Sequence, residues 1–315
     1  MTWVRLLVAL FNVFIFPGIL FSTFFGCLFL WVYRKIRARL QARIGPPWYQ
    51  VFADVLKLLS KETVIPRRAW KLGFVMAPII GLVGLLCSSQ IIPFTLGAYP
   101  LMFSGDLIVL MYLMTLPAVA LIVAGASSGN PYGAVGAGRE ASLALWYELP
   151  LIISAVSVAL ASGSFRLSDI TAYQASHGAF LIRLPCATIA AIICLQAKLG
   201  RRPFDIPHAE AEIIAGPLTD YSGALRGLFE ASAAIEWLMA PAFVTALFLG
   251  GPLTVWPIPG VVSFLLKCFG LVVLVSFVDV LNARLRIDQA LKPLWGVALP
   301  LSVFSLIRVL MGLGV

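Results

Sequence analysis

Charged residues are scarce in this sequence of 315 amino acids. Only 12% of the residues are Asp, Glu, Lys or Arg, whereas 61% are hydrophobic, and the mean hydropathy is +0.98. A soluble globular domain usually carries roughly a quarter of its residues as charges. The shortage excludes a soluble globule and indicates a protein whose solvent is largely the hydrocarbon core of a lipid bilayer.

Clustered metal ligands are also missing. The two histidines, His177 and His208, lie far apart in the sequence, and no two cysteines form a CxxC pair. All the cysteines lie within apolar runs: Cys27, Cys87, Cys186, Cys194 and Cys268. Iron–sulfur, zinc and nickel–iron centres need clustered thiolates or imidazoles. The sequence therefore argues against a redox centre in this chain, and we predict no cofactor.

The net charge of +9 does not by itself indicate a nucleic-acid partner. The Lys and Arg residues occupy short gaps between apolar runs rather than the surface of a separate polar domain. This distribution is the usual signal of membrane topology. We therefore expect the chain to bind no nucleic acid and to be surrounded by the lipid bilayer.

Eight apolar runs have about the length of 20 residues that a helix needs to cross a bilayer. They cover residues 4–33, 72–92, 104–126, 141–162, 179–197, 223–250, 260–283 and 291–313. We predict an all-α polytopic membrane protein with about eight transmembrane helices and a single domain over residues 1–315. Within residues 48–59, apolar residues recur at helical spacing, which predicts an additional amphipathic helix at the membrane interface.

The basic residues are distributed unevenly between the two sides of the predicted bundle. If the spans alternate in direction, most Lys and Arg residues fall on one side, chiefly in residues 34–71 and 198–202. The opposite side has little beyond Arg5, Arg166 and Arg183. By the positive-inside rule, we expect a multi-pass protein of the cytoplasmic (inner) membrane with both termini outside.

Carboxyl groups inside the predicted spans are informative, because a charge near a helix centre costs about 2.5–3.5 kcal/mol on insertion scales. Glu140 opens the fourth span, and Glu148 follows roughly 12 Å further along the helix axis. This spacing allows both to border one cavity without touching. Tyr147 nearly eclipses Glu140, and Pro150 can bend the helix beside Glu148.

The sixth and seventh spans also contain acidic residues. Glu230 and Glu236 enter the sixth span from the cytoplasmic side. Asp279 lies near the cytoplasmic end of the seventh span, close in sequence to Arg284 and Arg286. A carboxyl group in a low-dielectric environment can hold or pass a proton near neutral pH. These acids are therefore candidates for a proton relay.

The predicted depth of each acid in the membrane distinguishes a role in proton transfer from a structural role. Glu148 and Glu236 lie deep and precede prolines, which favours a function in proton transfer. Glu140 and Asp279 lie nearer the predicted interfaces, where a structural ion pair or a charge that reaches water is the simpler interpretation.

The connection over residues 198–223 is the most polar part of the chain and is long for a helical bundle. It carries charges of both signs, basic residues first and acidic residues after them: Lys198, Arg201, Arg202, Asp205, His208, Glu210, Glu212 and Asp220. Such a loop is either a docking surface for another protein or the mouth of a proton route. A merely solvated loop is the alternative.

Two segments carry a family resemblance. Residues 200–223, GRRPFDIPHAEAEIIAGPLTDYSG, resemble the acidic loop of the H-subunit family of respiratory complex I. Residues 38–62, ARLQARIGPPWYQVFADVLKLLSKE, resemble that family's segment between its first helix and its amphipathic helix. The resemblance extends over essentially the whole chain and implies eight transmembrane helices.

The same family includes membrane subunits of energy-converting (group 4) nickel–iron hydrogenases and formate hydrogenlyases. Complex I members typically have Thr or Ala before the sequence PFD, where this chain has Arg202. The following GPLTDYSG and the segment SSGNPYGAVGAGREA over residues 127–141 also resemble the hydrogenase type. The chain is therefore more similar to the hydrogenase branch.

The resemblance implies roles for particular residues. Glu140, Glu148, Glu230 and Glu236 would form a chain of intramembrane carboxylates, and the acids of the polar connection would line its entrance. With Asp279, the predicted relay comprises Glu140, Glu148, Asp205, Glu210, Glu212, Asp220, Glu230, Glu236 and Asp279. Docking to a soluble redox arm is predicted for Arg37, Arg39, Arg43, Arg201 and Arg202.

These observations predict a membrane anchor and ion-coupling subunit that performs no bond chemistry alone. Its expected partners are a nickel–iron large subunit, iron–sulfur subunits and antiporter-like membrane subunits, with electrons supplied by ferredoxin. Two alternatives remain open: the H subunit of a quinone-reducing complex I, and a free-standing secondary transporter that uses the same buried acids.

Overall fold

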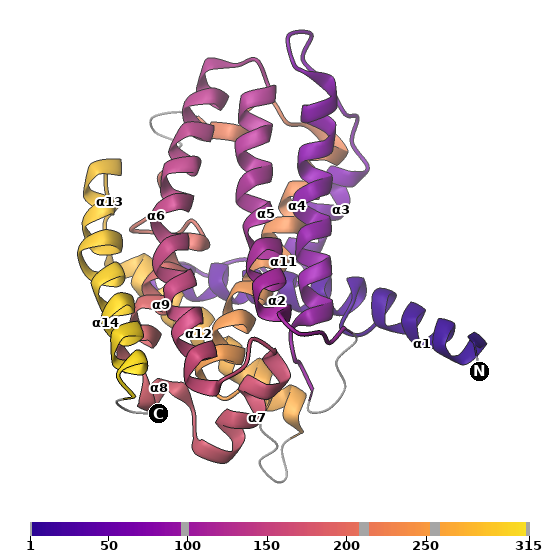
Figure 1. The fold of residues 1–315 in the computed structure, drawn as a ribbon. Coiled ribbons are helices and arrows are strands. Elements are labelled where there is room, and N and C mark those ends of the chain that lie inside the picture. Colours follow the sequence, from indigo (N-terminus) through magenta and orange to yellow (C-terminus); the bar gives the residue numbers. More distant parts are fainter. Residues whose placement is uncertain (1, 96–100, 208–213, 253–258, 313–315) are drawn as a thin grey trace.

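The computed structural model describes residues 2–95, 101–207, 214–252 and 259–312, with side chains from residue 7 onward, and these ranges contain helices but no strand. α4 (Lys71–Ile91), α5 (Asp106–Ser127) and α6 (Pro131–Ser162) stand side by side (Figure 1). α11 (Gly223–Phe248) packs against α4, and its most apolar stretch is 83% buried. α11 is therefore the central helix of the bundle.

In the described ranges, seven helical segments are long and apolar enough to cross a membrane, and α9 (Pro185–Lys198) is an additional, shorter apolar helix. The seven are Leu7–Leu40, Lys71–Ile91, Asp106–Ser127, Pro131–Ser162, Gly223–Phe248, Gly260–Leu281 and Ile287–Leu310. Gly260–Leu281 is α12. The last segment joins α13 (Ile287–Pro293), the π-helix η2 (Leu294–Ala298) and α14 (Leu299–Leu310). The predicted all-α polytopic fold is confirmed.

The boundaries predicted for the first span, residues 4–33, are wrong. The chain forms α1 (Thr2–Phe14) and α2 (Ile19–Leu40), interrupted at Pro17 and Gly18, because proline and glycine both disfavour a helix interior. α1 projects away from the bundle, whereas α2 crosses it and packs against α11 and α12 (Figure 1). α2 is therefore the first helix of the bundle proper.

The fourth span begins earlier than residue 141. Asn130 caps α6, since its side-chain oxygen accepts a hydrogen bond from the backbone N–H of Tyr132 at 3.0 Å, and Pro131 occupies the first turn, where its missing N–H costs nothing. Gly136 faces Pro217, and a Cβ there would come within 2.6 Å of the proline ring. The prediction that Glu140 opens this span is wrong, because Glu140 lies well inside α6.

The amphipathic segment forms α3 (Gln50–Leu59), as predicted. It packs against α11 and α2, with Val51 buried and Leu56 exposed. Asp54 on its polar side pairs with Arg34 of α2, at 3.1 Å between Oδ2 and Nη1. These contacts attach α3 to the end of the bundle where α2 finishes.

α9 is too short to cross a bilayer alone. α7 (Leu167–His177) and α8 (Phe180–Arg183) precede it, and its 14 residues span about 21 Å, against a hydrocarbon core of about 30 Å. Nζ of Lys198, at its end, donates a hydrogen bond of 2.7 Å to the carbonyl oxygen of Met114, near the middle of α5. The chain therefore leaves α9 inside the bundle and continues through the polar connection and η1 (Gly216–Leu218) to α11.

Topology reporters test the predicted orientation, which depends on α9 acting as a span. Fusions at Met1 and Val315 should both report the outside, and an insertion near Arg67 should report the cytoplasm. Alkaline phosphatase and fluorescent protein fusions give opposite signals on the two sides. A cytoplasmic Val315 with an outside Met1 would show that the number of crossings is odd and that α9 does not complete one.

Candidate functional site

A cavity of about 100 Å³ with both apolar and charged side chains in its lining lies among α5, α6, α9 and α11, and we call it the inner cavity. Its polar side chains are Glu140, Tyr147, Lys198, Arg201, Ser232 and Glu236. Pro117, in the middle of α5, also lines it, so the cavity lies deep in the bundle. A buried water needs roughly 10–15 Å³ of such space and several polar partners. The inner cavity therefore suits a short chain of water molecules between acidic groups.

The inner cavity joins acids that are remote in the sequence. Glu140 and Tyr147 come from α6, where seven residues make nearly two turns and place both side chains on one face. Glu236 enters the same cavity from α11. Glu140 is buried, which is unexpected for an interfacial residue. Glu140 therefore lies among buried side chains well inside α6 rather than at a helix end.

A second cavity, of about 330 Å³, lies between α5 and α6, and we call it the outer cavity. Glu148 lines it together with apolar side chains that include Met111, Leu151 and Phe243. The buried Oε1 atom of Glu148 accepts no hydrogen bond from the described residues. A carboxyl oxygen left without a protein partner in an apolar wall is exceptional in folded proteins and needs an explanation.

The spacing of Glu140 and Glu148 allows a single cavity, but the structure does not place both in one. Glu140 lines the inner cavity and Glu148 the outer one. Eight residues advance the helix by about 80° beyond two full turns. This rotation is enough for α6 to present the two acids to different cavities.

Lys198 lines both cavities. Its Nζ lies 5.4 Å from the centre of the Tyr147 ring, on the side of the inner cavity, and donates to Met114, which lines the outer cavity. The side chain is buried. Lys198 thus stands between the acids of the inner cavity and Glu148.

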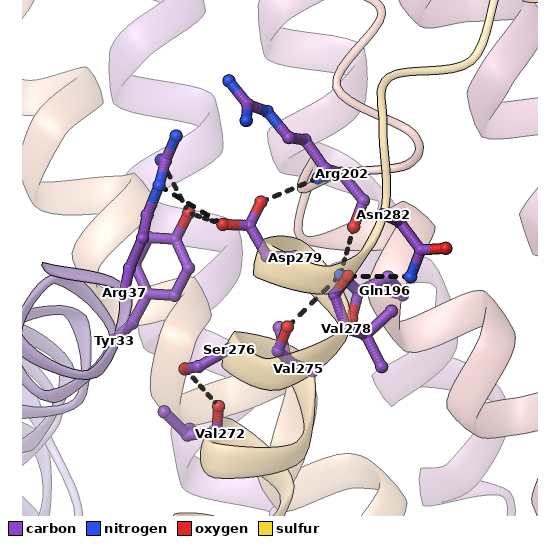
Figure 2. A network of polar contacts seen from close by, with 10 residues as sticks. All are labelled: Tyr33, Arg37, Gln196, Arg202, Val272, Val275, Ser276, Val278, Asp279 and Asn282. Atoms are coloured by element: carbon purple, nitrogen blue, oxygen red, sulfur yellow. Dashed lines mark hydrogen bonds and ion pairs between the residues drawn. The ribbon is translucent and has the colours of Figure 1, made fainter. Parts of the chain in front are cut away.

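Asp279 occupies a separate cluster at the end of α12 (Figure 2). Its Oδ2 accepts a hydrogen bond of 3.1 Å from the hydroxyl of Tyr33 and lies 3.4 Å from Nε of Arg37. Its Oδ1 accepts a hydrogen bond of 3.1 Å from the backbone N–H of Arg202. The residue is 1% exposed. Asp279 therefore ties α2, α12 and the polar connection together.

The expected proximity of Asp279 to Arg284 and Arg286 does not produce an ion pair with either. Arg284 instead contacts Asp205, donating from Nε to its backbone oxygen and placing Nη2 3.9 Å from its Oδ1. Burial raises the pKa of Asp205, and the positive charge of Arg284 opposes that rise. Asp205 is thus a partly buried acid of the polar connection, and its place at the entrance of a proton route stays a prediction.

An aromatic and cationic stack connects the Asp279 cluster to the inner cavity. The rings of Tyr33 and Trp237 stack with centroids 4.3 Å apart. The guanidinium of Arg201 lies 4.8 Å from the Tyr33 ring and 5.4 Å from the Trp237 ring, distances typical of cation–π contacts. Trp237 and Arg201 also line the inner cavity.

Two other predicted relay acids have local partners. Glu230 pairs with Arg226 one turn earlier on α11, at 2.8 Å. Asp220 accepts a hydrogen bond of 3.1 Å from the side chain of Asn130. Neither lines the inner or the outer cavity. Glu210 and Glu212 lie outside the described residues.

The predicted docking arginines fall into two groups. Arg39 and Arg43 are exposed, and Arg202 is half-buried, with its guanidinium directed away from Asp279 (Figure 2). Arg37 is engaged with Asp279, and Arg201 with the two rings beside the inner cavity. The positions of Arg37 and Arg201 do not support docking, because binding a partner would require them to leave buried contacts.

Within the described ranges, no group of three or more His, Cys, Asp or Glu side chains is arranged to hold a metal ion, and the cysteines are free thiols. Among the side chains that line the two cavities, the acids, Lys198 and the tyrosines Tyr112 and Tyr147 have groups that can bind and release protons.

From the sequence, Lys198 is predicted only as one charge of the polar connection and not as a residue buried between two cavities. A signal for it exists. Pro185 interrupts the apolar run over residues 179–197, and the helix that remains is too short to carry its last residue to the interface.

Comparisons with known proteins match nearly the whole chain. A profile of the family described as NADH dehydrogenase matches residues 13–310. The H subunit of the NADH-quinone oxidoreductase of Carboxydothermus hydrogenoformans is 33% identical, over 92% of this chain and 85% of that protein. The corresponding H subunit of Geobacillus kaustophilus is 36% identical, over 87% of this chain and 85% of that protein.

A solved structure shows the same architecture. The chain is similar to one in the membrane-bound sulfane sulfur reductase, an archaeal respiratory membrane complex, with a TM-score of 0.86 and 29% sequence identity. The match covers 97% of this chain and 99% of that chain.

Proposed function

This chain belongs to the NADH dehydrogenase family of membrane subunits, and we propose that it couples a ferredoxin-linked, hydrogenase-type redox complex to ion translocation. The observation that carries the coupling role is that Lys198 lines both the inner cavity, with Glu140 and Glu236, and the outer cavity, with Glu148. Membership in a family of oxidoreductase subunits favours this role over a free-standing transporter.

Two observations support the hydrogenase-type branch. Arg202 stands before the sequence PFD, as in the hydrogenase type that the chain resembles. The likeness to the sulfane sulfur reductase, which covers 99% of that chain, shows that this fold also serves complexes other than NADH-quinone oxidoreductases. The expected partners are a nickel–iron large subunit, iron–sulfur subunits and antiporter-like membrane subunits.

The proposed coupling begins at the polar connection. A change of charge in the soluble arm would alter the proton occupancy of acids beside it, among them Asp205, Glu210 and Glu212. Protons would then pass through the inner cavity, between Glu140 and Glu236, and reach Glu148 in the outer cavity. From there they would reach antiporter-like neighbours. This chain would contribute no bond chemistry of its own.

The composition of the intact complex tests whether this chain belongs to the hydrogenase-type branch of the family. We expect a complex purified through an affinity tag on this chain to contain stoichiometric nickel and iron–sulfur subunits, measured by elemental analysis and mass spectrometry. It should also evolve hydrogen with reduced ferredoxin. Stoichiometric bound quinone with no nickel would contradict the hydrogenase assignment.

A quinone-reducing complex is the second candidate, because one feature of the structure favours it. An apolar groove of about 320 Å³ runs between α2, α3, α4 and α11 and is lined by side chains such as Phe52, Leu82 and Leu228. The two relatives are H subunits of NADH-quinone oxidoreductases. Organic extraction of the purified complex, followed by chromatography, would detect a quinone held there.

Arm docking can be tested at Arg202. We expect Arg202→Ala to release the soluble subunits at a lower salt concentration than wild type, because the half-buried Arg202 directs its guanidinium away from Asp279, arginines bind acidic partners bidentately, and salt screens such pairs. Retention of the soluble subunits on a tagged membrane domain across a salt series measures this. Arg166→Ala, an exposed arginine on the predicted opposite side, serves as the control. Equal retention by all three proteins would contradict docking at Arg202.

A further inference from the structure

Lys198 is a buried cation without an acidic partner in direct contact. In the described part of the chain, no carboxylate oxygen lies within 4.0 Å of its Nζ, and its hydrogen bond goes to the carbonyl of Met114. A carbonyl and the face of the Tyr147 ring replace only part of the water that an ammonium group loses on burial. A charge held at such a cost inside a membrane domain is a candidate for function.

The charged and titratable groups around Lys198 are arranged in two sets. Toward the inner cavity lie Glu140 and Tyr147 of α6, Glu236 of α11 and Arg201 of the polar connection. Toward the outer cavity lie Glu148, one residue after Tyr147 on α6, and the largely exposed Tyr112 of α5. α5 contributes the Met114 carbonyl and no charged side chain to either lining. Lys198 is the charged side chain common to both linings.

A comparison with Lys267 shows what a structural lysine looks like in this fold. Lys267 lies within α12, a helix long enough to span the membrane, and its Nζ donates to two carbonyl oxygens, Leu249 at 2.7 Å and Gly251 at 2.8 Å. It thereby fixes the end of α11 and lines neither cavity. Lys198 makes one such bond and faces acids on two sides.

We propose that Lys198 is the positioning residue that links proton occupancy in the inner cavity to that of Glu148. Its ammonium group, on a flexible four-carbon stem, favours the ionised form of whichever acid it approaches. When a proton reaches Glu236 or Glu140, that carboxylate becomes neutral and the ammonium shifts toward Glu148. Glu148 then ionises by passing its proton onward. One proton enters, one leaves, and Lys198 keeps its own.

This inference rests on the proposed coupling function, and substitutions at Lys198 test it in the intact complex. Lys198→Gln keeps a donor for the Met114 carbonyl and removes the charge, whereas Lys198→Arg keeps the charge. Reconstituted into proteoliposomes, the Gln variant should retain all subunits and electron transfer but move at least about tenfold fewer ions per electron. The Arg variant should recover most of that stoichiometry. Lys267→Gln, the matched control, should pump as wild type.

The electron donor is the one that the purified complex accepts, reduced ferredoxin or NADH, and ion movement is followed with an entrapped pH or sodium indicator. Wild-type stoichiometry in Lys198→Gln would overturn the inference, as would equal loss in the Gln and Arg variants. Failure of both variants to assemble would also overturn it, since Lys198 would then be structural. If Glu148→Gln and Glu236→Gln pump normally, the proposed relay fails. If they are impaired and Lys198→Gln is not, only the role of Lys198 fails.

Discussion

Replacing Glu148 or Glu236 by Gln is expected to leave the complex assembled while abolishing most of the ion translocation that accompanies turnover. Gln keeps the size and hydrogen-bonding capacity of Glu but cannot titrate. A positioned acid or base contributes about 10²–10⁴-fold to proton transfer, so we expect coupled ion flux to fall by at least about tenfold. The measurement is the number of ions moved per electron in proteoliposomes, alongside subunit composition.

The control for this prediction is Asp169→Asn, an equivalent loss of one carboxylate at an exposed position on α7, which should pump as wild type. If both glutamine variants pump at wild-type stoichiometry, the two glutamates are structural and the cavities do not conduct. Loss in Glu236→Gln alone would place the route through the inner cavity and not through the outer one.

Replacing Asp279 by Ala is expected to destabilise the membrane domain severely. The substitution leaves the guanidinium of Arg37, the hydroxyl of Tyr33 and the backbone N–H of Arg202 without their shared acceptor (Figure 2). Asp279 is buried although the Arg37 side chain is 33% exposed, and each buried donor left without an acceptor typically costs about 1–3 kcal/mol. We expect a large fall in the midpoint of thermal unfolding of the detergent-solubilised complex and a lower yield of assembled protein.

Asp54→Ala provides the comparison, because Asp54 also pairs with an arginine of α2, but both side chains are about a third or more exposed. Exposed pairs contribute about 0.2–1 kcal/mol, so this variant should unfold close to wild type. The variant Asp279→Asn distinguishes the contribution of Asp279 to stability from a role in proton transfer, because Asn cannot titrate. A stable Asn variant that fails to pump would assign Asp279 to the relay, whereas a stable variant that pumps normally would confine it to the ion pair.

Much of the architecture follows from composition and local chemistry. Runs of apolar residues with the length of a bilayer predict the long helices, and the spacing of apolar residues predicts α3. The boundaries that failed depend on particular residues. Pro17 and Gly18 divide the first run, and the Asn130 cap with Pro131 starts α6 early. Both signals are in the sequence, but an average over hydropathy hides them.

The sequence predicts which acids belong to the candidate site but not which of them share a cavity. Acids in apolar runs identify Glu140, Glu148 and Glu236 because burying them is costly. Their division between two cavities depends on how α6 is rotated against α5 and α11, which periodicity within one helix does not determine. The sequence suggests docking for Arg201 because loops are usually exposed, but stacking on rings from α2 and α11 is a tertiary effect.

The central position of α11 has a consequence for how the protein is made. Among the seven long segments, α11 has the lowest mean hydropathy, and it carries Arg226, Glu230 and Glu236. Alone, it would partition into lipid less readily than its neighbours, yet it emerges from the ribosome before α12 and α14. We expect its insertion at the translocon to depend on helices made earlier, with α2 and α4 offering a protein surface in place of lipid. Biogenesis would then be ordered, and truncated chains that end soon after Phe248 would retain α11 only when α2 and α4 precede it.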